Sequence, residues 1–351
     1  MKLPALMLGM LLALLGAPSD GDEEGLPGPA SHRRASHVSG AAINQECEGC
    51  HVAIAAEWRA SQHRQSNTNP AFVRSLSKQP LPFCRRCHAP EADPKKEASG
   101  WAAENGIACI TCHLLGEKIS SGISNQGKLP TAQDLAHPIV RDARLSGDGA
   151  CERCHEFQFP DGRWRRRPEF MQLTVREHAQ SLHAETSCIE CHMPRAADGH
   201  RSHRFLSGHD EATLRAALRI EANLRGDALE IVLTPQRVGH ALPTGDLFRR
   251  LLVRVEDPKA GDRLLAQQAL TRRFSFEQQV PGATVRVTAG DDRIYDSKTL
   301  HVPLAANIEE VRWSVRYQRV LFPQGASNGR AIVDGEVILG QGINRRVSFK
   351  P

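Results

Sequence analysis

The pattern of hydrophobic and polar positions divides the 351-residue chain into segments of different character. The first, from Leu3 to Leu15, is an apolar run that follows a single lysine and precedes small and acidic residues. This order is typical of a secretory signal peptide, because about 13 apolar residues are fewer than the roughly 20 that span a membrane. We therefore expect a signal peptide over residues 1–19, with an uncleaved membrane anchor as the alternative. Residues 20–43, rich in Pro, Gly and Asp, are predicted to be a disordered linker.

The last part of the chain alternates hydrophobic and polar residues with the period of two that is typical of β-strands. One short helix is expected first, over residues 211–222, because Leu214, Leu218 and Ala222 recur every four residues. Strands are then predicted at 228–234, 247–256, 283–290, 311–322, 331–339 and 345–350. Six or more short strands without intervening helices predict an antiparallel β-sandwich-like domain over residues 211–351. The predicted fold class is therefore α+β, with a mainly helical first domain.

That first domain, residues 44–210, contains all ten cysteines, arranged as five Cys-x-x-Cys pairs that are each followed by histidine. The motifs are Cys47, Cys50 and His51; Cys84, Cys87 and His88; Cys109, Cys112 and His113; Cys151, Cys154 and His155; and Cys188, Cys191 and His192. This spacing marks covalent attachment of c-type haem, since both thiols reach the vinyl groups of one porphyrin. The histidine that follows then faces the iron as its proximal ligand. With 16 histidines in 351 residues, five such placements by chance have a probability on the order of 10⁻⁷.

Two other uses of Cys-x-x-Cys pairs fit this domain less well. Structural zinc needs no histidine after every pair, and thioredoxin-like redox chemistry needs only one pair. Five haem c groups would instead supply most of the core, which accounts for an aromatic content of only 5%. Their propionates would also offset the formal net charge of +5, so we expect redox proteins rather than nucleic acid as partners.

Histidines outside the motifs are candidates for the sixth iron ligands. Iron bound by two imidazoles transfers electrons, whereas catalysis on small molecules needs an open position, so an ample supply of histidines favours electron transfer. If the stretch from His51 to His63 is helical, it spans about 18 Å, which places His63 over a neighbouring haem. The preferred distal ligands are His63, His137, His203, His209 and His240.

The surroundings of the other histidines leave several roles open. His200 is expected to be solvated. At most one of His178 and His183 should bind iron, because residues five apart do not share a helix face. His240 lies in VGHALPTGD, where the Pro-Thr-Gly turn would fix the loop and aim the imidazole back at the haems. The alternative is a histidine that only hydrogen-bonds within its turn; if His240 does bind iron, an iron–nitrogen bond joins the two domains.

From about Asn44 to Arg250 the chain resembles a known family in the order as well as the content of its motifs. It is similar to bacterial multihaem c-type cytochromes related to the tetrahaem electron carriers of ammonia oxidisers and to pentahaem nitrite reductases. The stretches that carry the resemblance are CEGCH, EWRASQH, GIACITCH, AHP, CERCHEF, CIECHMP, SHRFLSGHD and GHALPTGDLFRR. The resemblance implies that His63, His137 and His203 are distal haem ligands.

The chain differs in two ways from the enzymes among these relatives. Pentahaem nitrite reductases carry their catalytic haem on a C-x-x-C-K motif, and lysine follows none of the pairs in this sequence. The two tyrosines, Tyr295 and Tyr317, both lie in the C-terminal part, so a cross-link of the hydroxylamine-oxidising kind is not evident. Relatives often have tryptophan where His178 stands, which leaves His178 and His183 open.

These features predict a periplasmic or otherwise exported electron carrier with five haem c groups, mostly ligated by two histidines. No catalytic residue is predicted. The alternative is a multihaem oxidoreductase that acts on nitrite, hydroxylamine or another small oxyanion at one five-coordinate haem. A third possibility is a subunit whose β-domain associates with a membrane redox complex.

Overall fold

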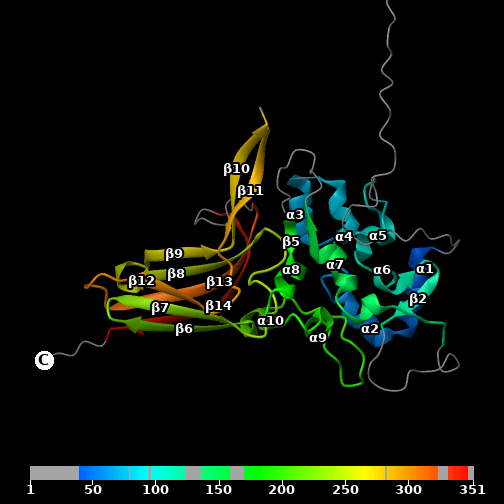
Figure 1. Cartoon of the computed structure of the whole chain (residues 1–351), viewed down its shortest axis with the longest axis horizontal. Coiled ribbons are helices and arrows are strands. Elements are labelled where there is room, and N and C mark those ends of the chain that lie inside the picture. Colours follow the sequence, from blue (N-terminus) through cyan, green and yellow to red (C-terminus); the bar gives the residue numbers. More distant parts are fainter. Residues whose placement is uncertain are drawn as a thin grey trace, which may run out of the picture.

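A computed structural model of the chain shows a helical region followed by a β-rich region, which lie side by side in Figure 1. The fold is α+β, as the sequence predicts. The structure describes residues 39–78, 80–93, 96–122, 136–158, 170–280, 283–322 and 331–346. The expected signal peptide lies outside these residues, as does the expected linker as far as residue 38. Within the described ranges, no helix has both the length and the apolar character needed to cross a membrane.

Short helices and very short strands make up the first region. The helices are α1 (Gly40–Cys50), α2 (Val52–Arg59), α3 (Pro70–Lys78), α4 (Arg85–His88), α5 (Gly100–Asn105), α6 (Cys109–His113), α7 (Gly149–His155), α8 (Thr174–Ala179) and α9 (Cys188–His192). The strands are β1 (Leu114–Leu115), β2 (Lys118–Ser121), β3 (Val140–Arg141), β4 (Glu156–Gln158) and β5 (Phe170–Leu173). The buried apolar cluster of this region is small, and it consists of Trp58, Ala108, Ile110 and Leu114.

Polar side chains mark the start of α1 and the end of α2. Ser39 caps α1 by accepting a hydrogen bond from the Ala42 amide at 3.2 Å, so the last residues of the expected linker are helical. The helix expected to run from His51 to His63 ends earlier, at Arg59. Ser61 follows, and its hydroxyl accepts from the Arg64 amide at 3.3 Å, a local bond that competes with helix continuation. His63 therefore lies in a turn.

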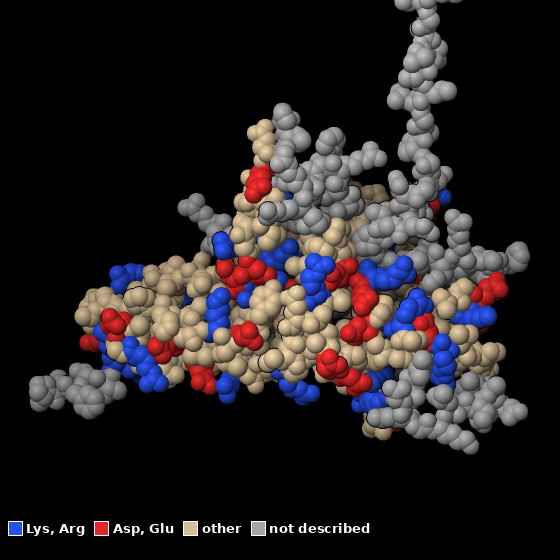
Figure 2. All heavy atoms as spheres, viewed as in Figure 1, with Lys and Arg blue, Asp and Glu red and all other residues tan. Residues whose placement is uncertain are grey.

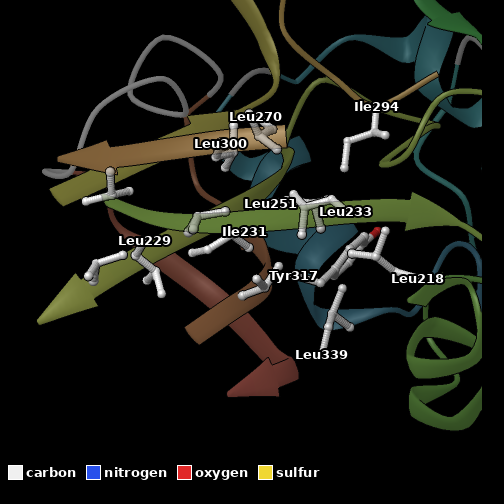
Figure 3. Close-up of a cluster of buried hydrophobic side chains, with 14 of the residues drawn as sticks. Leu218, Leu229, Ile231, Leu233, Leu251, Leu270, Ile294, Leu300, Tyr317 and Leu339 are labelled. Atoms are coloured by element: carbon white, nitrogen blue, oxygen red, sulfur yellow. The ribbon is translucent and has the colours of Figure 1, made fainter. Parts of the chain in front are cut away.

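The second region begins with helix α10 (Glu211–Ala216) and continues as antiparallel strands. The strands are β6 (Leu218–Arg225), β7 (Ala228–Pro235), β8 (Arg249–Asp257), β9 (Arg263–Leu270), β10 (Arg272–Val280), β11 (Ala283–Asp291), β12 (Lys298–Pro303), β13 (Glu310–Val320) and β14 (Val333–Arg345). Sheet β12-β7-β6 and sheet β14-β13-β8-β9 share one hydrophobic core, which includes Ile231 of β7, Leu251 of β8 and Val315 of β13, each fully buried. Figure 3 shows this core between the sheets. The arrangement is the predicted sandwich-like one.

The helix predicted over residues 211–222 is wrong in its second half. Leu218 begins β6, in which buried or half-buried side chains alternate with exposed ones along the strand. Its backbone pairs with β7 from Leu218 opposite Pro235 to Arg225 opposite Ala228. The apolar positions used to predict the helix also fit the period of two of a strand. Burial of these positions against the second sheet stabilises the strand rather than the helix.

Three strands were not predicted from the sequence: β6, β9 and β10. Strands β10 and β11 form a separate two-stranded ribbon that projects from the sandwich (Figure 1). At its base, Arg272 donates to the carbonyl oxygen of Phe170 at 2.8 Å and so contacts the helical region. On the face shown in Figure 2, acidic and basic side chains are interspersed over both regions.

Candidate functional site

The five motif histidines occupy equivalent places in the helical region. Four of them are the last residue of a short helix that begins within two residues of the first cysteine of its motif, and His51 caps the end of α1. A helix brings the two cysteines of a motif onto neighbouring positions of its surface. The histidine lies about one helical turn beyond the first cysteine. Each motif is therefore a rigid unit that presents two thiols and an imidazole.

Four of these five histidines face a second histidine at almost the same distance. The ring centroids are separated by 6.3 Å for His51 and His137, 6.3 Å for His155 and His63, 6.2 Å for His113 and His203, and 6.3 Å for His192 and His240. A metal–imidazole bond is about 2 Å long, so two imidazoles on opposite sides of one metal have nitrogens about 4 Å apart and ring centres about 6 Å apart. The four pairs have the separation that a shared iron requires.

The second histidine of each pair comes from a separate part of the chain. His63 lies in the turns after α2, and His137 lies just before β3. His203 lies between α9 and α10, and His240 lies in the loop between β7 and β8 of the β-rich region. The rings of His240 and His192 are nearly parallel, at 11°. Whether these residues bind iron remains a prediction, but the fold brings together four of the five preferred distal candidates with motif histidines.

Backbone carbonyl groups orient most of these imidazoles. The Nδ1 atom lies 2.7 Å from the oxygen of Ser66 for His88, 2.9 Å from that of Ser120 for His113, 2.6 Å from that of Leu206 for His192, 2.7 Å from that of Arg201 for His203, and 3.0 Å from that of Ala241 for His240. A carbonyl oxygen accepts only from N–H, so Nδ1 carries the proton and Nε2 keeps its lone pair. This is the tautomer that binds a metal through Nε2.

Burial favours the neutral form of four of these imidazoles. Burial, together with His155 and His192, lowers the pKa of His63 to about 3, and burial, together with His192, lowers the pKa of His155 to about 4. The pKa values of His203 and His240 are also lowered, first by burial. A neutral imidazole is the form that coordinates a metal, so these four rings have the protonation state that haem iron needs.

Cysteines of different motifs lie next to one another. The ten cysteines, all within the described residues, form no disulfide bonds with one another. Cys87 of the second motif is hydrogen-bonded to Cys154 of the fourth, and Cys151 of the fourth is hydrogen-bonded to Cys188 of the fifth. These contacts bring the second and fifth motifs against the fourth.

The first and third motifs are neighbours too, and the third is close to the fourth. Burial, together with the charge of Cys47, raises the pKa of Cys109 to about 12. Burial likewise raises the pKa of Cys112 to about 11, with a contribution from Cys151. The motifs therefore follow each other in space in the order first, third, fourth and fifth, with the second beside the fourth.

His88 is the exception among the motif histidines. In the described part of the chain, the ring that contacts it is that of Phe72 in α3, at 3.6 Å between centroids and 5° between planes. His209, the remaining predicted distal ligand, does not face His88 across the distance seen in the other pairs. The charges of Arg249 and Arg319 act on His209, whose pKa desolvation lowers to about 4.

The less favoured histidines have other contacts. His178 lies with Nδ1 2.8 Å from the carbonyl oxygen of Gly239. His200 lies between Asp198, at 2.5 Å, and Glu57, at 3.3 Å, and the hydrogen bond with Asp198 raises the pKa of His200. Glu57 also accepts from the His203 amide at 2.7 Å. These histidines support the loops that carry His240 and His203.

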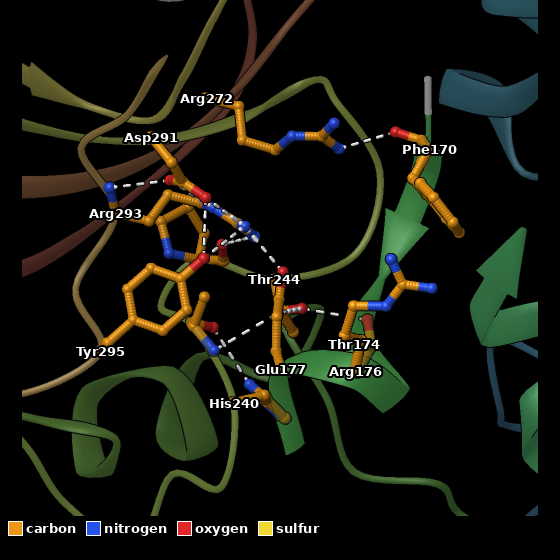
Figure 4. A network of polar contacts seen from close by, with 12 residues as sticks. Phe170, Thr174, Arg176, Glu177, His240, Thr244, Arg272, Asp291, Arg293 and Tyr295 are labelled. Atoms are coloured by element: carbon orange, nitrogen blue, oxygen red, sulfur yellow. Dashed lines mark hydrogen bonds and ion pairs between the residues drawn. The ribbon is translucent and has the colours of Figure 1, made fainter. Parts of the chain in front are cut away.

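A buried ion-pair network, not foreseen from the sequence, holds the loop of His240 (Figure 4). The Glu177 carboxylate of α8 accepts from the Ala241 amide at 3.3 Å and from the Thr244 hydroxyl at 2.6 Å. Arg293 forms ion pairs with Glu177 and with Asp291, each at 2.7 Å. We call Glu177, His178, Asp291 and Arg293 the His240 clamp, because Glu177 and His178 bind the backbone on either side of His240.

Gly106 provides a test of how tightly the turn of His63 is built. Its φ is +51°, and a Cβ there would lie 2.6 Å from the His63 carbonyl oxygen and 2.8 Å from that of Arg64. We expect Gly106→Ala to destabilise the protein by about 1–3 kcal/mol and to weaken the low-spin signal of one haem. Thermal unfolding and electron paramagnetic resonance (EPR) of the holoprotein measure both effects. Gly335→Ala is the control, since a Cβ at Gly335 meets no atom within 4 Å; equal effects of the two substitutions would contradict the prediction.

The residues present fit haem c. Each motif offers two thiols and an adjacent imidazole, and four motif imidazoles face a second imidazole at the distance for shared iron. The small apolar cluster of the helical region also fits a core built largely from macrocycles. In the described residues, no group of three or more His, Cys, Asp or Glu side chains gathers as in a protein-only metal site.

Comparisons with known proteins point in the same direction. Residues 46–114, which contain the first three motifs, match the family described as "Cytochrome c554 and c-prime". The fold is similar to the crystal structure of a penta-heme cytochrome c552 from Thermochromatium tepidum, with a TM-score of 0.63 and 19% identity. That match covers 86% of this chain and 98% of the other. No curated protein sequence matches the chain. The matched segment and the shared fold together support a multihaem c-type cytochrome.

Proposed function

We propose that this protein is an exported, periplasmic electron carrier in which five covalently attached c-type haems transfer electrons between redox proteins. The observation that carries the proposal is the set of four histidine pairs. Each joins a motif histidine to a histidine from a distant stretch at 6.2–6.3 Å. Iron held by two imidazoles changes its charge without binding substrate, which suits an electron carrier.

The contacts between motifs support a continuous path for the electrons. The order first, third, fourth and fifth follows from the neighbouring thiols of these motifs. Haems attached at these motifs would form a series in the same order and would supply the redox centres of the path, from the first motif to the fifth beside the β-rich region. The chain's own backbone carbonyl groups hold most of the imidazoles in place.

The proposal predicts both the number and the ligation of the haems. Mass spectrometry of the holoprotein should show five covalently bound haems and the loss of the signal peptide, and ferric EPR should show mainly low-spin signals. Reductive titration should then remove these signals. A protein with fewer than five haems, or with mainly high-spin iron, would contradict the proposal.

A second candidate function follows from His88, which no histidine of the described residues faces at the distance of the other pairs. Iron with an open position binds small molecules, so the haem of the second motif could serve ligand binding or catalysis. A high-spin component in the ferric EPR spectrum that changes when nitrite is added would favour this function. Spectra that nitrite leaves unchanged would favour the carrier alone.

A further inference from the structure

Two arginines of the β-rich region meet next to the second motif. Arg249 at the start of β8 and Arg319 near the end of β13 are directly opposite each other in the antiparallel ladder. Like charges in such a pair repel, so their burial needs compensation. Their side chains are only 17% exposed, and Asp246 lies between them, 2.8 Å from Arg319 and 3.4 Å from Arg249. We call Asp246, Arg249, Tyr317 and Arg319 the arginine cluster.

The arginine cluster carries more positive than negative charge. One carboxylate, Asp246, serves both guanidinium groups. The Tyr317 hydroxyl accepts a hydrogen bond from Arg249 at 2.6 Å but adds no negative charge. The next acidic residue, Asp334, lies 3.9 Å from Arg319 but is paired with Arg74 at 2.6 Å. Among the described residues, the buried Nε atoms of Arg249 and Arg319 have no hydrogen-bond partner. A buried site with one excess positive charge and unused donors favours an anion.

Helix α3 connects this cluster to His88. Phe72 of α3 stacks on the His88 ring, and two residues further along, Arg74 pairs with Asp334 beside Arg319. Burial lowers the pKa of His88, and the charges of Asp246 and Arg319 also act on it, so both groups are close to that imidazole. The chain is tightly packed here as well, since a Cβ at Gly208 would lie 2.9 Å from the Tyr317 hydroxyl and 3.0 Å from Arg249.

We propose that the haem of the second motif binds a small monovalent anion, and that Arg249 and Arg319 of the β-rich region provide the positive charge that recognises it. The inference rests on the proposed haem attachment at Cys84 and Cys87 and extends the second candidate function. It also gives the β-rich region a second role beside carrying His240. The anion would donate a lone pair to ferric iron, and no bond in it need break.

Binding of azide and nitrite to the ferric holoprotein tests the inference. We expect one haem of the wild-type protein to be high-spin and to become low-spin as azide is added, with saturation in EPR and in the absorption spectrum. Arg319→Gln and Arg249→Gln should each raise the dissociation constant about tenfold or more, because each removes a charged hydrogen-bond donor. Tyr317→Phe, which keeps the ring and the fold, should weaken binding less.

Arg312→Gln is the matched control. Arg312 lies on the same strand as Arg319 but is 42% exposed and pairs with Asp262, so its replacement should leave the dissociation constant unchanged. Only low-spin haems in the wild-type protein, or the same azide affinity in Arg319→Gln as in Arg312→Gln, would overturn the inference. A change in midpoint potential with unchanged anion affinity would also overturn it, because the arginines would then pair with haem propionates.

The proposed haem attachment is tested separately from the anion site. Mass spectrometry of the peptide that contains Cys84 and Cys87 shows whether haem is attached there. Its absence would contradict the proposed function itself. A haem attached at this motif whose azide affinity does not depend on Arg249 or Arg319 would contradict only the anion site.

Discussion

Replacing His240 with alanine is expected to convert one low-spin ferric haem to high spin. The ring of His240 lies 6.3 Å from that of His192, and its Nδ1 is hydrogen-bonded to the Ala241 carbonyl, which leaves Nε2 for iron. Alanine removes that ligand and leaves one axial position open. EPR and the absorption spectrum of the ferric holoprotein measure the change, and added imidazole should restore the low-spin signal.

The same substitution should loosen the contact between the two regions. If iron joins His192 in the helical region to His240 in the β-rich region, metal binding contributes directly to folding, and its loss lowers the stability of the assembled chain. His301→Ala is the control, because His301 is an exposed residue of β12 that contacts Glu230. An unchanged spectrum in His240→Ala, or the same change in His301→Ala, would reject His240 as a ligand.

The sequence predicts which residues form the candidate site more fully than it predicts which of these residues pair with each other. The five motifs follow from local spacing, and His240 follows from its turn and from the number of irons still to be capped. The partner of each distal histidine depends on tertiary structure, since His63 faces His155 across 92 positions of sequence. The same limit applies to His209, because its sequence context does not distinguish it from the other candidate ligand in the same loop.

In the fold, too, some features can be predicted from the local sequence and others depend on contacts between distant residues. The alternation in β7 and β13 is visible in the sequence, and both strands were predicted. Strand β6 was missed because the spacing of Leu214, Leu218 and Ala222 fits a helix as well as it fits a strand. The His240 clamp leaves no local signal, because Glu177 is an ordinary helix residue until Arg293, far along the chain, pairs with it.

Replacing Arg293 with methionine is expected to lower the free energy of unfolding by about 3–5 kcal/mol, because it leaves the buried Glu177 carboxylate without its partner. The side chains of Arg293 and Glu177 are each only 4% exposed. Arg293 also pairs with Asp291 and donates to the Pro243 carbonyl at 3.3 Å. Denaturant unfolding followed by circular dichroism measures the loss, and the haem spectrum reports whether His240 is released in the same transition.

The control for Arg293→Met is Lys259→Met. Lys259 pairs with Glu309 at 2.6 Å, but both side chains are more than half exposed, so the loss should be below about 1 kcal/mol. The double variant Glu177→Gln with Arg293→Met should recover part of the stability, since it removes the buried carboxylate that Arg293→Met leaves without its partner. Equal losses in Arg293→Met and Lys259→Met would show that the clamp does not stabilise the loop.

The clamp also makes stability depend on pH. Burial opposes ionisation of Asp291, but Arg293 outweighs it and holds the pKa of Asp291 below its ordinary value. The unfolded chain therefore takes up a proton at Asp291 before the folded protein does, so the contribution of this pair is present above about pH 4 and is lost as the pH falls further. Acid unfolding of Arg293→Met should show a weaker dependence on pH in that range than the wild-type protein. A parallel dependence in the two proteins would mean that other carboxylates control acid unfolding.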